Sequence, residues 1–270
     1  MLYFEPVQSD LYKLRVPFED IDTGVFCVLT AKGTVIIDSA AGAYDVRQYI
    51  IPAIQELGDV LGKRYLAVRQ ILCTHAHGDH AGGLSALHAR FPEAKIGAFL
   101  QSVCPPLSVP AFELLSDGDL IMDCIRVLHL PGHTDDSAGF LDQRTKTLIC
   151  GDSLQFFGVG RYGCGIASWS AYRKTLNRLL EEDIDNIVAS HDYVPMGGNA
   201  DGRDEARAYI NCCLACAEQI RSFVGTEYLL HHTDPKKIAS TFNKRVGAAR
   251  GLPPLPISLV RCIMKEEDWQ

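Results

Sequence analysis

The chain has 270 residues, of which 47% are hydrophobic and 22% are charged, enough apolar material for one large core with or without a smaller appendage. Lys and Arg number 26 against 33 Asp and Glu, which gives a formal net charge of -7 without any basic block. This balance argues against nucleic acid as the main partner and gives no reason to expect binding to an anionic membrane.

The amino-terminal residues and the cysteines bear on the compartment. Residues 1–20 lack the basic start and unbroken apolar stretch of a signal peptide, and no segment approaches the roughly 18 apolar residues of a membrane span. The 10 cysteines are scattered through apparent strands and helices. Reduced thiols therefore fit better than disulfides, and we expect a cytoplasmic protein without a membrane partner.

The first hundred residues alternate short strands with helices. The patterns predict strands at 25–29 and 34–37, and then a helix over 46–57 in which Pro52 marks an irregularity. A second apolar run, at 68–73, leads directly into a histidine-rich segment. A helix over 84–90 and a strand over 95–99 follow.

The middle of the chain is predicted to begin with a proline-containing loop over 104–119, near the mouth of any site. Strands resume at 120–130 and 140–150, and an amphipathic helix is expected over 169–182. A short strand at 187–189 then ends at Ser190 and His191. The recurrence of strand, helix and strand indicates an α/β (α+β) fold, with helices packed outside a two-sheet core.

The character of the chain changes at about Arg203. Helices are expected over 203–224, 235–246 and 259–265. We therefore expect a catalytic domain over 1–202 and a helical appendage over 203–270, which would serve as a lid, a substrate wall or the surface of a homodimer.

The densest cluster of chemically active side chains follows the apolar run at 68–73. His75, His77, Asp79 and His80 fall within six positions, and Gly78 eases the bend between them. Imidazole and carboxylate groups are suitable ligands for zinc and also for iron or manganese. A metal site is therefore a better interpretation than a polar loop with hydrogen-bonded histidines.

This run resembles the HxHxDH signature of the metallo-β-lactamase superfamily. Later landmarks follow in order, with His133 in Pro-Gly-His-Thr, Asp152 in Cys-Gly-Asp-Ser and His191 in Ala-Ser-His-Asp. The resemblance covers about residues 20 to 195. It implies an αββα sandwich with metals at one edge between the sheets.

The resemblance also implies a ligand set for two divalent metal ions, zinc first, with iron or manganese as alternatives. The first metal would be bound by His75, His77 and His133, the second by Asp79, His80 and His191, and Asp152 would bridge them. A hydroxide between the metals would be the nucleophile, with Asp79 orienting it or taking up a proton. Asp38 resembles a family position that supports the metal loop without binding metal.

The substrate is predicted less directly. The segment from Gly151 to Arg161 resembles glyoxalase II thioesterases, in which a basic residue matching Arg161 helps to hold a carboxylate. Gln155 stands where the lactonases of the superfamily have a tyrosine, although Tyr162 or Tyr193 could replace that group. These residues are the candidates for binding a small-molecule substrate.

Three functions are therefore open at this point. The first is a dinuclear hydrolase of a small ester, thioester, lactone or phosphoester. The second is a mononuclear iron oxidoreductase resembling the persulfide dioxygenases, which keep the equivalents of His75, His133 and Asp152. The third is a ligand sensor that retains metal but has little turnover.

Overall fold

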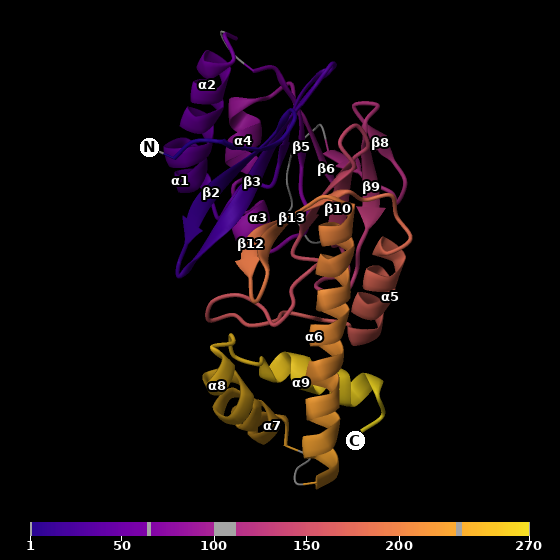
Figure 1. The fold of residues 1–270 in the computed structure, drawn as a ribbon. Coiled ribbons are helices and arrows are strands. Elements are labelled where there is room, and N and C mark those ends of the chain that lie inside the picture. Colours follow the sequence, from indigo (N-terminus) through magenta and orange to yellow (C-terminus); the bar gives the residue numbers. More distant parts are fainter. Residues whose placement is uncertain (1, 64–65, 100–111, 231–233, 270) are drawn as a thin grey trace. The chain divides into compact units, whose positions relative to one another are not determined.

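The computed structural model describes residues 2–63, 66–99, 112–230 and 234–269 (Figure 1). The chain forms two compact units, each described here by itself. Unit 1 comprises Met1–His129 and Asp136–Gly151, and unit 2 comprises Leu130–Asp135 and Asp152–Gln270. The expected boundary between a catalytic domain and a helical appendage at 202/203 stays a prediction. In the ranges given above, no helix has both the length and the apolar character needed to cross a bilayer.

Unit 1 contains a seven-stranded sheet whose strands follow one another in chain order. The first four strands pair antiparallel, and the last three continue in parallel from β4. Because β4, β5 and β6 run in the same direction, the segments that follow them meet at one edge of the sheet. The strands are β1 (Glu5–Gln8), β2 (Leu11–Phe18), β3 (Ile21–Thr30), β4 (Gly33–Ile37), β5 (Val68–Leu72), β6 (Lys95–Ala98) and β7 (Phe112–Leu114).

Helices cover one face of this sheet, as Figure 1 shows for α2 and α4. Cys27 and Ile71 from the strands share one buried cluster with Val46, Ile54 and Leu84 from the helices. Burial of this apolar surface holds the helical layer on the sheet. The helical segments are α1 (Ala43–Asp45), the π-helical η1 (Val46–Ile50), α2 (Ile51–Val60), α3 (Gly78–Ala81) and α4 (Leu84–Arg90).

A second set of antiparallel strands in unit 1 runs in the order β11-β10-β9-β8. The Ala138 N–H donates to the carbonyl of Thr74 at 2.8 Å, and Nη1 of Arg144 donates to the carbonyl of Leu29 at 2.9 Å. These bonds tie the set to the seven-stranded sheet. The strands are β8 (Leu120–Ile121), β9 (Ile125–His129), β10 (Ala138–Asp142) and β11 (Thr147–Gly151).

Unit 2 is built around one long helix. Helix α6 (Arg203–Leu230) buries a stripe that includes Tyr209, Cys213, Ile220 and Val224, and it contacts the hairpin of β12 and β13 as well as α5. In Figure 1, α7 and α9 lie around the carboxyl-terminal half of α6, and both contact it. The other elements are α5 (Trp169–Leu179), β12 (Asn186–Tyr193), β13 (Gly197–Asp201), α7 (Pro235–Phe242), the π-helical η2 (Asn243–Gly247), α8 (Ala248–Arg250) and α9 (Ile257–Glu266).

The mixed α/β class with two sheets is confirmed, but several boundaries differ from the prediction. The irregularity at Pro52 is present, because η1 changes to α2 at Ile51. The expected loop over 104–119 is wrong where β7 forms at Phe112–Leu114, and residues 100–111 lie outside the described ranges. The strand expected at 187–189 extends to Tyr193, so His191 lies within β12.

Candidate metal centre

Asp38 directly follows β4 and holds in place the histidine segment of unit 1, residues 75–80, which carries the predicted ligands. Its side chain is completely buried, and the Thr74 N–H donates to Oδ1 at 2.8 Å. The Thr74 hydroxyl donates to Oδ2 at 2.8 Å, and Nδ1 of His80 lies 2.8 Å from the same oxygen. A buried carboxylate is stable only when such donors satisfy it. Asp38 therefore fixes both ends of the histidine segment, as expected for a residue that supports the ligands.

The bonds to Asp38 also determine which nitrogen of two histidines can bind a metal. A proton on Nδ1 of His80 is needed to bond Asp38, which leaves Nε2 as the lone-pair donor. The Thr74 hydroxyl, whose hydrogen is used on Asp38, lies 3.1 Å from Nδ1 of His75 and accepts a hydrogen bond from it. His75 and His80 therefore both present Nε2.

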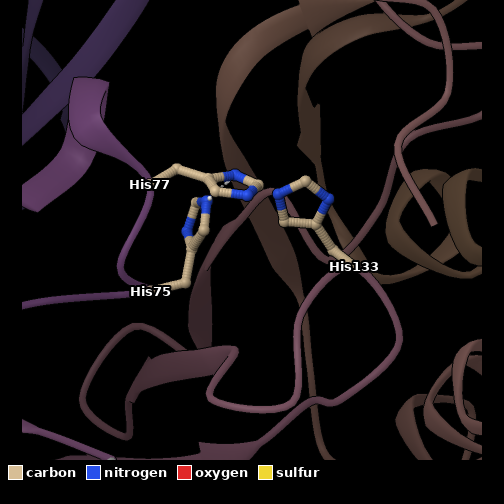
Figure 2. Close-up of side chains that lie close together, drawn as sticks. All are labelled: His75, His77 and His133. Carbon is tan, nitrogen blue, oxygen red and sulfur yellow. Dashed lines mark hydrogen bonds between the residues drawn. The ribbon is translucent and has the colours of Figure 1, made fainter. Parts of the chain in front are cut away.

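His77 and Asp79 complete the donors of unit 1. Nδ1 of His77 lies 3.0 Å from Nε2 of His75, and Figure 2 shows these two side chains converging from the segment after β5. Oδ2 of Asp79 accepts the Thr23 hydroxyl at 3.0 Å and lies 3.3 Å from Nε2 of His80. His133, also drawn in Figure 2, belongs to unit 2. Unit 1 thus places its four predicted ligands in two pairs, His75 with His77 and Asp79 with His80.

Two glycines allow the histidine segment to pack against the backbone that follows Asp38. A Cβ on Gly82 would lie 2.2 Å from the carbonyl oxygen of Ala41. A Cβ on Gly83 would lie 2.1 Å from the carbonyl oxygen of Ser39. Any larger side chain would force α3 and α4 away from this backbone and displace His80.

Unit 2 arranges its three predicted ligands around one carboxylate oxygen. Nε2 of His133 lies 3.6 Å from Oδ2 of Asp152, and Nε2 of His191 lies 3.4 Å from the same oxygen. All three side chains are buried, and they come from a turn, the end of β11 and the middle of β12. The donor atoms of these three side chains thus lie close enough together to contact a bound cation.

Hydrogen bonds hold His133 on the side away from Asp152. Its Nδ1–H donates to the carbonyl of Gly165, which leaves Nε2 as the lone-pair donor. Nε2 of Gln155 packs 2.7 Å from the same Nδ1, but both nitrogens carry hydrogen, so this contact is not a second hydrogen bond. The amide of Gln155 accepts the Gly165 N–H at 2.6 Å and donates to the carbonyl of Asp152 at 2.9 Å. One side chain therefore joins the two ligand segments, a role that the sequence did not reveal.

Helix α5 holds the turn that carries His133. The Thr175 hydroxyl donates to the carbonyl of Pro131 at 2.6 Å. Gly132 has φ +142° and lies so close to Tyr172 that a Cβ would be 2.5 Å from its Cα. The Gln155 N–H donates to the Tyr172 hydroxyl, and burial raises the pKa of that hydroxyl well above its ordinary value, so it stays protonated.

The predicted substrate residues occupy two different places in unit 2. Arg161 and Tyr162 line a cavity of about 500 Å³, together with Lys236 and Lys244 from the helical tail. The two lysines were not predicted, because they carry no motif. Tyr193 is buried beside His191, with ring centroids 5.7 Å apart, and is not among the residues that line this cavity.

Comparison with a protein-family model supports the assignment of the landmarks. The model of the metallo-beta-lactamase superfamily matches residues 21–98 and 103–191, a range that includes all seven predicted ligands. Because this match covers more than half of the chain, it identifies the family directly.

Curated relatives include hydroxyacylglutathione hydrolases. That of Francisella tularensis subsp. novicida is 33% identical over 139 residues, covering 50% of this chain and 54% of the relative. That of Francisella philomiragia is 33% identical over 133 residues, covering 47% of this chain and 51% of the relative. The chain therefore spans about half the length of these relatives.

Solved structures share the fold at low sequence identity. A metallo-beta-lactamase family protein from Thermus thermophilus matches with a TM-score of 0.72 and 19% identity, over 97% of this chain and 95% of that one. A metallo-beta-lactamase from Erythrobacter litoralis matches with a TM-score of 0.63 and 20% identity, over 81% and 96%. These likenesses confirm the predicted fold.

Proposed function

The chain belongs to the metallo-β-lactamase superfamily, and on that premise we propose that it is a metal-dependent hydrolase of a small ester or thioester. The observation that carries this proposal is the position of Asp152, whose Oδ2 lies within 3.6 Å of one imidazole Nε2 and 3.4 Å of another. Neutral imidazoles around a carboxylate suit zinc, and iron or manganese accept the same donors.

We assign the donors to two divalent cations. His75, His77 and His133 would hold the first cation and Asp79, His80 and His191 the second, with Asp152 shared between them. The support is that each unit orients its own donors by internal bonds, and that the family model spans both units. Divalent cations bound by these donors would lower the pKa of a coordinated water and polarise the scissile carbonyl.

The remaining steps fall to side chains of the chain itself. Asp38 and Thr74 keep Nε2 of His75 and His80 available throughout a reaction, because each bond fixes a tautomer. Asp79, positioned by the Thr23 hydroxyl, would orient the attacking water and take up its proton at a carboxylate oxygen.

A thioester is the favoured substrate. The curated relatives are named for hydrolysis of a hydroxyacyl thioester of glutathione. Position 155, where the lactonases of the superfamily have a tyrosine, carries a glutamine whose amide bonds Gly165 and Asp152, so this position offers no phenol to a substrate. We propose a small-molecule substrate, with Arg161 and Tyr162 as binding residues, and a cytoplasmic setting.

The test is hydrolysis of a panel of acyl thioesters, esters, lactones and phosphodiesters by zinc-, manganese- and iron-loaded protein. The proposal predicts turnover of a thioester or ester that is lost in His77→Ala and Asp152→Ala, and retained in the control His88→Ala. His88 lies in α4, outside the seven ligand positions. Full activity of either ligand variant, or no turnover of any ester or thioester, would contradict the proposal.

A further inference from the structure

Helix α6 carries three cysteines close together in the sequence, Cys212, Cys213 and Cys216. Residues four apart lie on the same face of a helix, so Cys212 and Cys216 are neighbours one turn apart. Their thiols are hydrogen-bonded to each other. Cys213 is engaged elsewhere, because its thiol is hydrogen-bonded to the Tyr172 hydroxyl. Helix α6 therefore presents one pair of thiols in direct contact.

The two thiols of this pair differ in exposure. Cys216 is only 3% exposed, whereas Cys212 is half-buried. Burial raises the pKa of the Cys216 thiol to about 12 and outweighs the opposite effect of the Arg250 guanidinium. Near neutral pH Cys216 is thus an uncharged S–H group. A ligand from solvent would meet Cys212 first and a neutral second thiol one turn along the helix.

The surroundings of the pair supply no further metal ligand. Among the described residues, no group of three His, Cys, Asp or Glu donor atoms within 4.8 Å of one another contains a cysteine. Cys164, which interacts electrostatically with Cys216, belongs to no such group. A structural zinc ion takes four ligands, so the pair is incomplete as a zinc site. It suits a ligand that bonds two thiols and no more.

A direct disulfide between the two thiols does not suit the helix. Cβ atoms one turn apart on a helix are separated by about 5–6 Å. A disulfide needs Cβ atoms about 3.8 Å apart. Closing the bond would therefore distort α6, which packs through buried residues such as Tyr209 and Ile220. An atom inserted between the two sulfurs spans the longer separation and leaves the helix intact.

We propose that Cys212 and Cys216 bind a monosubstituted trivalent arsenical, R–As(OH)2, through two As–S bonds. Both S–H bonds and both As–OH bonds break, two As–S bonds form, and each hydroxyl leaves as water with a thiol proton. Arsenic stays trivalent, so the reaction needs no oxidant or reductant. The carbon substituent occupies the third position on arsenic, and for this reason two thiols complete the site. Because the thiols react as neutral groups, the high pKa of Cys216 does not oppose the reaction.

The experiment uses phenylarsine oxide, whose hydrate is the phenyl member of this class. The purified chain, loaded with zinc and reduced with a phosphine, is titrated with the probe, and intact-protein mass spectrometry counts the phenylarsenic groups bound. Competition with the dithiol dimercaprol then gives the relative affinity. The unmodified chain should bind one group and keep it in excess 2-mercaptoethanol, because release to a monothiol requires both As–S bonds to break.

Serine variants identify the two thiols. Cys212→Ser and Cys216→Ser should each bind the probe about a hundredfold more weakly, because the second As–S bond is lost. Cys262→Ser is the matched control, since it removes another half-buried thiol of unit 2, and it should stay within about twofold of the unmodified chain. Cys213→Ser should also retain binding, which excludes a pair that includes Cys213.

The outcomes decide the assignment without any measurement of turnover, so they do not depend on the proposed function. Cys212→Ser changes a half-buried residue, and its circular dichroism melting curve shows whether the fold is retained. Loss of binding in a folded Cys212→Ser variant, together with retention in Cys262→Ser, supports the site. No binding by the unmodified chain, unchanged affinity in Cys212→Ser, or equal loss in Cys262→Ser would overturn it.

Discussion

Nε2 of Gln155 lies 2.7 Å from Nδ1 of His133, on the side of the ring opposite Asp152. The same Gln155 amide accepts the Gly165 N–H and donates to the Asp152 carbonyl. The side chain thus joins the segments that carry two of the predicted metal ligands. Its contribution is to position them, since it is not itself one of the predicted ligands.

Replacing Gln155 by Leu should weaken metal binding. The change leaves the Gly165 N–H and the Asp152 carbonyl without their partner, and it loosens the Gly165 backbone, whose carbonyl accepts the Nδ1 proton of His133. Loss of such supporting bonds typically costs 10–100-fold in metal affinity, and we expect roughly tenfold. Competition with a chromophoric chelator measures this. Gln143→Leu, an exposed site between β10 and β11, is the control, and equal affinities of the two variants would refute the positioning role.

The variant Asp38→Asn tests whether the Asp38 carboxylate positions the predicted ligands of unit 1. Asn accepts the positive φ of +64° at this position, but its NH2 cannot accept the Nδ1 proton of His80. We expect metal affinity to fall by about 10–100-fold, and stability to fall by about 2 kcal/mol because a buried bond is lost. Chelator competition and urea unfolding measure the two effects. The exposed Asp59→Asn should change neither, and a metal affinity unchanged in Asp38→Asn would contradict the role given to Asp38.

Gly132→Ala should displace the turn before His133. The added Cβ would meet the Tyr172 backbone at 2.5 Å while the backbone keeps φ +142°, so both strain and overlap oppose it. We expect a loss of about 2–4 kcal/mol in unfolding free energy, together with weaker metal binding. Gly118→Ala is the matched control, because Gly118 has φ +89° with nothing within 4 Å of the added Cβ. That variant should lose about 1 kcal/mol; similar losses in both variants would show that the contact with Tyr172 is unimportant.

Glu266 gives the chain a stability that depends on pH. Its carboxylate in α9 accepts the N–H groups of Trp169 and Ser170 and the Ser168 hydroxyl at the start of α5. Burial raises the pKa of this carboxyl, but the hydrogen bonds from Ser170, Ser168 and Trp169 outweigh burial, and the pKa is lowered from 4.5. The charged form is therefore the one that stabilises the fold.

The Glu266→Gln variant should be about 1 kcal/mol less stable than the unmodified chain at neutral pH. Because the pKa in the folded chain lies below the unfolded value, this difference should be constant above about pH 5 and should shrink as the pH falls through the folded pKa. Urea unfolding between pH 3 and pH 8 measures it. Glu181→Gln, an exposed control two residues after α5, should show no such trend. A gap that widens on acidification would contradict the capping role.

The sequence predicted the fold best where local patterns agree with tertiary packing. Residues 84–90 have helical spacing and form α4 with those bounds. Strands were harder, because their pairing depends on other segments of the chain. β1, β2 and β13 were not predicted, although β2 is eight residues long, and β7 lies within the expected loop over 104–119. Each of these strands is completed by pairing with a neighbouring strand, which propensity alone does not describe.

The candidate ligands could be found from the sequence because their motif lies in a few fixed positions, but the groups that hold them could not. Gln155 acts through Gly165, ten positions away, and Thr23 acts on Asp79 across 56 positions. Lys236 and Lys244 reach the cavity only because α7 and η2 pack beside the loop of Arg161. Such relationships depend on tertiary packing, which periodicity and composition do not describe.

The most direct test of the proposed two-cation site is the metal content of the purified chain, measured by inductively coupled plasma mass spectrometry beside that of Asp152→Ala. The account predicts two divalent ions per chain, chiefly zinc, and loss of at least one in the variant, because the shared carboxylate is removed. A single iron per chain with no second metal, or an unchanged content in Asp152→Ala, would contradict it.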